Sequence, residues 1–292
     1  MKYLVNTFEF IGKHILFVIP LFIAYVVPAI VSEPVNKLVK AQSEELARMV
    51  NADPSLVMSF NDFFELYSTL LPSMRTLWII SLVSLIPLII IVPATYGMVN
   101  KALNTGNASL IDFFPEFAKN VVKFIKFVVA TIIIYFGIGV VVAVLAGICI
   151  ALMSVWMPLG VLAFVLVGAV VLAGLIASAI LLLFSFPAMV SDNLDIFDAL
   201  KRSVSVGKSY FWYTLAVLLI VNVGSSTISF IVDAFLDKVP YVGSVISSAA
   251  LTLAQFIIIV FSFEVYRDKT NEDEYINNDE NLVAETPNDY LD

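Results

Sequence analysis

The sequence predicts a polytopic α-helical membrane protein with six transmembrane helices, and two observations support this fold class. The 292 residues are 60% hydrophobic and only 14% charged, with a mean hydropathy of +0.97. This composition leaves too little polar surface for a soluble domain of such length. The charges also avoid long apolar stretches, and a helix needs about 20 apolar residues to cross a bilayer core of roughly 30 Å.

The predicted spans contain no charged residue. They cover residues 15–31, 77–99, 127–152, 159–190, 211–232 and 239–263. The first could be mistaken for a signal peptide, because Lys2 and Lys13 precede an apolar run. That run contains Pro20 and Pro28, and no convincing cleavage site follows it, so we expect a mature span.

The distribution of Lys and Arg predicts the topology. When the N-terminus is placed in the cytoplasm, the cytoplasmic segments hold most of the basic residues, as the positive-inside rule requires. We therefore expect a multi-pass protein of the plasma membrane with both termini in the cytoplasm. The acidic segment 268–292 lacks apolar periodicity, which predicts a disordered cytoplasmic tail after a membrane domain at 1–267.

Three similar segments indicate an internal repeat. The even-numbered spans end with IIIVPATYGMVNK (89–101), LLLFSFPAMVSDN (181–193) and IIIVFSFEVYRDK (257–269). The odd-numbered spans each begin with a Lys and aromatic residues ahead of an apolar helix. We therefore predict three parallel helix hairpins, each preceded by an amphipathic entry helix on the cytoplasmic side.

An extracytoplasmic insertion at 33–75 interrupts the first predicted hairpin. Apolar residues at near-helical spacing in 33–50 and 59–74 predict two amphipathic helices that lie on the bundle or on the outer leaflet. The other hairpins have no such insertion. We therefore expect a partner-binding surface here, formed by Phe60, Phe63, Phe64 and Tyr67.

The stretch FPAMVSDNLDIFDALKRSVSVGKSYFW (186–212) resembles six-span membrane protein families of bacteria and archaea. These include the membrane domain fused to some glycerophosphodiester phosphodiesterases, and stand-alone proteins of unknown function. The resemblance covers the six-span region and implies that fold. This chain has no phosphodiesterase domain, so the resemblance implies no enzymatic activity.

Asp192, Asp195 and Asp198 in the same stretch are the main candidates for an acidic catalytic or metal site. We interpret them instead as the first turns of a short helix at a cytoplasmic elbow between hairpins, where acids complement the helix dipole. A metal or catalytic site would need further carboxylates, and Asp112 and Glu116 are the obvious candidates.

The sequence otherwise offers little chemistry. One cysteine and one histidine argue against a zinc or redox centre. The spans lack ionisable residues of the kind that proton-coupled transporters use, and no nucleotide-binding or hydrolase motif is present. We therefore expect no enzyme, no metal and no cofactor.

Small residues recur at intervals of four in the third and fourth spans, and this spacing predicts close packing between the two helices. They are Gly139, Ala143 and Gly147 in one span and Ala169, Ala173 and Ala177 in the other.

Polar residues form a seam along the fifth and sixth spans. They are Asn222, Ser225, Ser226, Ser229, Ser244, Ser248, Thr252 and Gln255. One hypothesis is that they join the two helices by interhelical hydrogen bonds, and the other is that they line a cavity for a small solute.

These observations predict an integral membrane scaffold or accessory protein that acts through membrane-protein or lipid interaction, without catalytic chemistry. The alternative is a transporter or channel for a neutral small solute or lipid through the polar seam. We expect membrane lipids and another membrane protein as partners, and no nucleic acid. The oligomeric state stays open.

Overall fold

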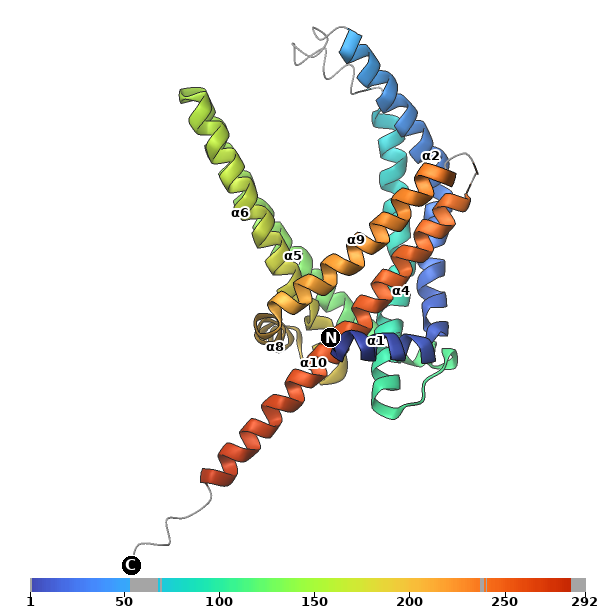
Figure 1. Cartoon of the computed structure of the whole chain (residues 1–292), viewed down its shortest axis with the longest axis vertical. Helices are drawn as coiled ribbons and strands as arrows, with labels where there is room; N and C mark the ends of the chain where they lie inside the picture. The colour runs from blue at the N-terminus through green and yellow to red at the C-terminus, as the bar shows by residue number, and fades with distance from the viewer. Residues whose placement is uncertain (1, 53–67, 69, 237–238, 240, 285–292) are drawn as a thin grey trace, which may run out of the picture.

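The protein is built from helices, as a computed structural model shows for residues 2–52, 68, 70–236, 239 and 241–284 (Figure 1). Only the backbone is described for Ala52, Asp233 and the residues after Asn271. In chain order the helices are α1 (Lys2–Lys13), α2 (Val18–Ala52), α4 (Leu71–Thr105), α5 (Phe113–Val155), α6 (Met157–Leu183), α7 (Ser185–Ser191), α8 (Ile196–Ser209), α9 (Phe211–Leu236) and α10 (Val242–Ala284).

Six of these helices are long and apolar enough to cross a membrane, namely α2, α4, α5, α6, α9 and α10. They cover most of each span predicted from the sequence, and the predicted all-α polytopic membrane fold is confirmed. The fourth predicted span, 159–190, is divided at Phe184 into α6 and α7. Several helices extend well past the predicted span boundaries, because the boundaries were placed at the first charged residue and a helix continues into water without changing its backbone.

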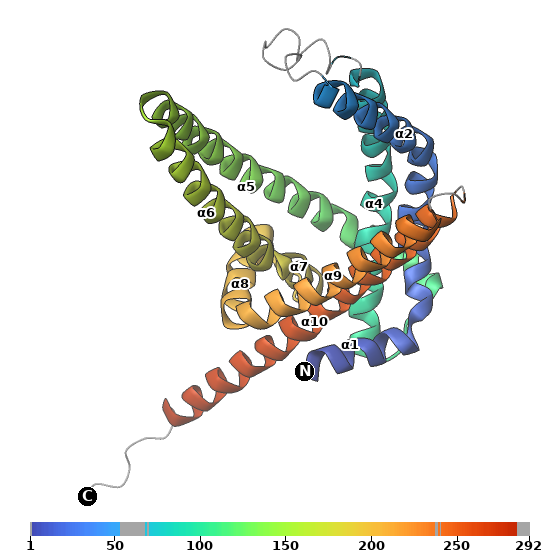
Figure 2. The ribbon, with the colours of Figure 1, turned by 45° about the horizontal axis from the view of Figure 1, so that its top comes forward.

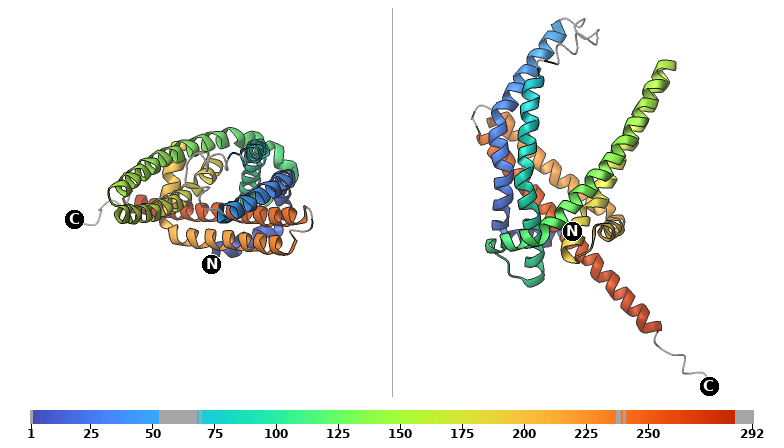
Figure 3. Two further views of the ribbon diagram at one scale, coloured as in Figure 1. Left: turned by 90° about the horizontal axis from the view of Figure 1, so that it is seen from above. Right: turned by 180° about the vertical axis from the view of Figure 1, so that it is seen from behind.

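The long helices are paired in sequence order as the hairpins α2–α4, α5–α6 and α9–α10, and the hairpins splay apart. Figures 1 and 2 show that α5–α6 leans away from α2–α4, while α9 and α10 cross alongside α2 and α4. The view from behind in Figure 3 shows the same opening. The hairpins converge where α1, α7 and α8 lie, and we call this end of the molecule the base.

The main apolar core lies at the base. Helices α4, α7 and α10 supply fully buried side chains there, including Met98, Met189, Phe261 and Phe263. The three similar sequence segments, 89–101, 181–193 and 257–269, therefore meet in one core. Close packing of aromatic and aliphatic side chains from all three hairpins joins them, because lipid provides no hydrophobic driving force between helices and van der Waals contacts must hold them together.

Hydrogen bonds at three matching positions of these segments connect the hairpins in a ring. Asn100 Nδ2 donates to the Val190 carbonyl at 3.4 Å. The Tyr266 hydroxyl donates to Asp192 at 2.6 Å, and the Tyr3 hydroxyl donates to Asp268 at 2.6 Å. The last bond ties α10 to the N-terminal helix α1. Each matching polar residue thus fixes its helix end to an element that is distant in sequence.

The first predicted amphipathic helix of the insertion does not form a separate element. Helix α2 instead runs unbroken from Val18 to Ala52 and includes residues 33–50. Extending an existing helix fixes one residue per hydrogen bond, whereas a new helix must first be nucleated. The Ser73 hydroxyl of α4 donates to Gln42 Oε1 at 3.0 Å, so α4 follows this extension. Phe60, Phe63, Phe64 and Tyr67 lie outside the described residues.

Two helices cross boundaries that the sequence suggested. The tail was expected to be disordered from Asp268, but α10 continues as helix to Ala284, beyond which the residues are not described. Entry helices are separate only in α1 and α8, because α5 runs continuously from Phe113 to Val155. In α5 no glycine or interior proline interrupts the junction with the apolar span.

The expected close packing of small residues between α5 and α6 is also wrong. The two helices do pack together, but a Cβ added at Gly139, Gly147 or Gly174 would meet no atom within 4 Å. Cys149, by contrast, is buried. A stripe of small residues permits a close approach without requiring it, and here much of the stripe faces away from the partner helix.

Gly97 is one of the glycines at which a neighbouring helix approaches closely, and it gives a first prediction. A Cβ at this position would lie 2.6 Å from Glu116 Oε2 and 2.7 Å from Glu116 Cβ on α5. In Gly97→Ala, overpacking of about 1–3 kcal/mol outweighs a helix-propensity gain of about 1 kcal/mol. We expect a net loss of up to about 2 kcal/mol in unfolding titrations, whereas Gly139→Ala is expected to be neutral or stabilising. Equal effects of the two substitutions would contradict the packing described here.

Candidate functional site

A polar groove lies between α2, α9 and α10 on the side of the molecule away from the base. Its volume is about 580 Å³, within the range of small-molecule sites. Its lining residues carry mostly hydroxyl and amide groups. They are Tyr25, Ala29, Ser32 and Asn36 of α2, Ser225, Ser226, Ser229 and Phe230 of α9, and Ser244, Ser247, Ser248 and Leu251 of α10.

Five of the eight polar residues singled out in the sequence line this groove: Ser225, Ser226, Ser229, Ser244 and Ser248. The other three do not. Asn222 is exposed and donates to the Leu218 carbonyl of its own helix. Thr252 is buried and donates to the Ser248 carbonyl, while Gln255 lies one turn further along α10.

The expected hydrogen bonds across the seam are absent among these eight residues. Within the described part of the chain, each hydrogen bond that they donate goes to the backbone of the same helix or to Glu33 of α2. The seam therefore does not join α9 to α10 directly. It forms a polar surface that faces α2, and this places a third helix at the candidate site.

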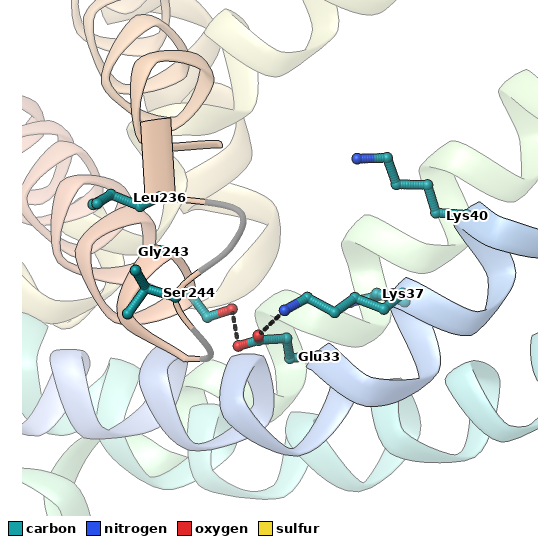
Figure 4. A pocket seen from close by; sticks show the side chains of 8 residues that line it. Glu33, Lys37, Lys40, Leu236, Gly243 and Ser244 are labelled. Carbon is teal, nitrogen blue, oxygen red and sulfur yellow. Dashed lines mark hydrogen bonds and ion pairs between the residues drawn. The ribbon is translucent and has the colours of Figure 1, made fainter. Parts of the chain in front are cut away.

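Glu33 fixes the rim of the groove. This carboxylate is 9% exposed and accepts hydrogen bonds from the Tyr241 backbone N–H at 3.0 Å and from the Ser244 hydroxyl at 2.8 Å. The Lys37 ammonium pairs with it at 2.8 Å (Figure 4). These contacts hold α2 against the turn between α9 and α10. The carboxylate and Lys37 also border a smaller depression of about 260 Å³, which shares Asn36 and Ser244 with the groove.

That α2 lines the groove was not predicted from the sequence. The first predicted span ended at Val31, so Ser32 fell outside it and Glu33 and Asn36 were assigned to the insertion and not to the bundle. A signal was present, because Ser32 and Asn36 share a helical face with Tyr25 and Ala29. Recognition of that face required knowing that the helix continues past Glu33.

The three elbow aspartates do not form a cluster. Asp192 follows α7 and accepts the hydrogen bond of Tyr266, so its expected place in the first turns of the next helix is wrong. Asp195 is the N-cap residue of α8 and pairs with Lys126 at 2.8 Å, and Asp198 lies in the first turn. The hydrogen bond from Lys126 and the N–H of Ile196 hold the pKa of the Asp195 carboxyl below its usual value.

The remaining acidic candidates are also engaged in separate contacts. Asp112 pairs with Lys101 at 2.6 Å, and Glu116 accepts a hydrogen bond from Asn120 at 3.2 Å. Within the described part of the chain, no three His, Cys, Asp or Glu side chains lie close enough to hold a metal ion. The groove is thus the candidate site that gathers most of the polar residues singled out in the sequence, and its described lining residues offer neutral donors and acceptors of hydrogen bonds.

Comparison with known proteins identifies no relative: no protein-family model, curated protein or solved structure matches the chain.

Proposed function

We propose that this protein is an integral membrane accessory protein that binds a membrane amphiphile from the side, in the groove between α2, α9 and α10, and performs no catalysis. The observation that carries the proposal is the grouping of hydroxyl side chains from three helices in one open groove. Hydroxyl groups in a membrane-spanning segment need hydrogen-bond partners, because hydrocarbon provides none. A polar headgroup would supply them.

The groove also suits a molecule with an apolar part. Phe230 and Leu251 line it and are exposed, so apolar side chains stand beside the hydroxyls. An amphiphile entering from the membrane could place its headgroup on the serines and its chain along these residues. This combination of apolar walls with a few polar groups is typical of ligand sites.

Binding is better supported than passage across the membrane, because the groove ends on packed side chains. Toward the base, the same three helices contribute Leu21, Val217 and Phe256, each at most 1% exposed and all part of the core. Lining residues 25–36 of α2 span about 16 Å along the helix axis, roughly half of a bilayer core. Packed side chains therefore bound the groove toward the base.

The proposed function predicts a lipid that stays bound when other lipids are removed. After detergent-free extraction into nanodiscs and transfer to native mass spectrometry, we expect one amphiphile retained per protein. Ser226→Leu/Ser229→Leu fills the groove and should lose it. The matched control is Asn222→Leu/Thr227→Leu, which adds two leucines to exposed positions of the same helix outside the groove. Retention of the same lipid by both variants would refute binding in the groove.

A transport function for a neutral solute is the second candidate, favoured by a second depression on the other side of α2. Tyr25, Ala29 and Ser32 line both the groove and this depression of about 280 Å³, which continues to Ser81 and Ser84 of α4. Pro28 lies between them within α2, where a proline favours a kink. Solute flux into reconstituted vesicles that is abolished by Ser226→Leu/Ser229→Leu would favour this function over lipid binding alone.

A further inference from the structure

The groove serines of α9 and α10 differ from most other hydroxyl residues of the membrane helices, whereas Ser32 of α2 donates to the Ala29 carbonyl of its own helix. Ser84, Ser178 and Thr227 each donate to a backbone carbonyl three or four residues earlier in the same helix. This local bond is the usual way in which a helical hydroxyl is satisfied in an apolar environment. Thr227 makes it although its neighbours in sequence line the groove.

Five groove hydroxyls remain unpaired within the described residues. The Ser247 Oγ is buried and has no partner. The hydroxyls of Ser225, Ser226, Ser229 and Ser248 likewise make no hydrogen bond to another described residue, and Ser248 is only 5% exposed. Each hydroxyl offers one donor and two acceptor sites. A ligand that satisfies these hydroxyls would both donate and accept several hydrogen bonds.

The charge around the groove argues against an anionic occupant. No lining residue of the groove is an Asp, Glu, Lys, Arg or His. In the adjoining depression, the Lys37 ammonium is paired with Glu33 (Figure 4), and Lys40 also has an interaction within the chain. A phosphate headgroup is normally bound by Arg or Lys in charge-assisted contacts. No unpaired cation is offered here by the described lining residues.

We propose that the groove binds the headgroup of a neutral, hydroxyl-rich lipid, such as a sugar linked to a diglyceride. This inference rests on the proposed function and names its ligand class. Sugar hydroxyls both donate and accept, so they can pair with the serine hydroxyls, and they need no counter-charge. The aromatic side chains of Tyr25 and Phe230 supply apolar surface for the C–H faces of the ring.

The test compares three lipids and one soluble sugar on the full-length protein. Phosphatidylcholine nanodiscs are doped with a monoglucosyl diacylglycerol, with phosphatidylglycerol or with additional phosphatidylcholine as the reference, and free glucose is added in a separate arm. Native mass spectrometry measures the fraction of protein that retains each ligand. We expect selective retention of the glucosyl lipid over phosphatidylglycerol and over free glucose.

Two matched triple variants identify the site. Ser225→Ala/Ser229→Ala/Ser248→Ala removes three unpaired groove hydroxyls, and we expect its affinity for the glucosyl lipid to fall by about tenfold or more. Ser154→Ala/Ser178→Ala/Ser209→Ala removes three hydroxyls that bond their own helices elsewhere, and its affinity should be unchanged. The temperature at which the buried Cys149 begins to react with a thiol-reactive dye is measured for both variants, and an unchanged temperature shows that they are folded.

The outcomes separate this inference from the proposed function. Selective binding of phosphatidylglycerol that the groove variant weakens would overturn the neutral ligand class and leave the proposed function standing. If free glucose bound as well as the glucosyl lipid, the ligand would be a soluble sugar and not a lipid headgroup. Lipid retention that does not respond to the groove variant or to Ser226→Leu/Ser229→Leu would overturn both.

Discussion

Replacing Phe186 with alanine is expected to destabilise the protein by about 3–5 kcal/mol, the usual loss for a buried phenylalanine. Phe186 lies on α7 and is 2% exposed. Its ring centroid lies 4.7 Å from that of Tyr96 on α4 and 5.3 Å from that of Phe124 on α5. The ring therefore connects the first two hairpins at the base. Its removal would leave a cavity that these long helices cannot close without moving.

The measurement is a reversible unfolding titration in mixed micelles, followed by intrinsic tyrosine and tryptophan fluorescence. Phe136→Ala is the matched control, because this phenylalanine lies on α5 and is 74% exposed. Its substitution should change the free energy of unfolding by less than about 1 kcal/mol. If Phe186→Ala were as stable as Phe136→Ala, the core at the base would not hold the hairpins together.

Removing the Asp192 carboxylate should have the second-largest effect, about 1.5–3 kcal/mol for a hydrogen bond to a charged group whose partner becomes unsatisfied. The partner is the Tyr266 hydroxyl at 2.6 Å, on a tyrosine that is fully buried in the core. Asp192→Ala leaves this hydroxyl without its acceptor. Tyr266→Phe removes the donor and keeps the ring, so its cost should be smaller than that of Asp192→Ala.

A double-mutant cycle measures the Asp192–Tyr266 bond itself. We expect Asp192→Ala/Tyr266→Phe to be more stable than the sum of the two single effects predicts, because the unsatisfied hydroxyl is no longer present. Asp198→Ala, in the exposed first turn of α8, is the control for loss of an elbow carboxylate and should cost less than about 1 kcal/mol. Strict additivity in the cycle would show that the bond does not couple the second and third hairpins.

The sequence was sufficient for the membrane class and for the six spans. Hydropathy determines these features because a bilayer imposes one minimum length on every apolar helix. Segments 89–101, 181–193 and 257–269 were also recognised as similar, and they form the core at the base. Their contacts with one another could not be predicted, because a similarity along the chain does not state which faces meet in space.

Only the α9 and α10 side of the groove was predicted from the sequence, because the α2 side depends on contacts between distant parts of the chain. Its serines on α9 and α10 were evident from their clustering, but Glu33 was placed outside the bundle because a charged residue was taken to end the first span. The contacts that keep Glu33 at the rim come from Tyr241 and Ser244, more than 200 residues along the chain. Side-chain pairing over such a separation leaves no local signal in one sequence.

The stripe of Gly139, Ala143 and Gly147 failed as a packing signal for the opposite reason. Its local pattern is clear, yet packing depends on which face the turn at Trp156 directs toward α6. The sequence does not give the rotation of one helix relative to the other. The pattern therefore shows where a close approach is allowed and not where it happens.

A density map of the protein in lipid nanodiscs tests the central claim most directly. We predict density for a bound headgroup between α2, α9 and α10, within hydrogen-bond distance of the Ser225 and Ser229 hydroxyls. A groove closed by contact of α9 with α2, or lipid density restricted to the outer surface of the helices, would contradict the claim that this protein binds an amphiphile there.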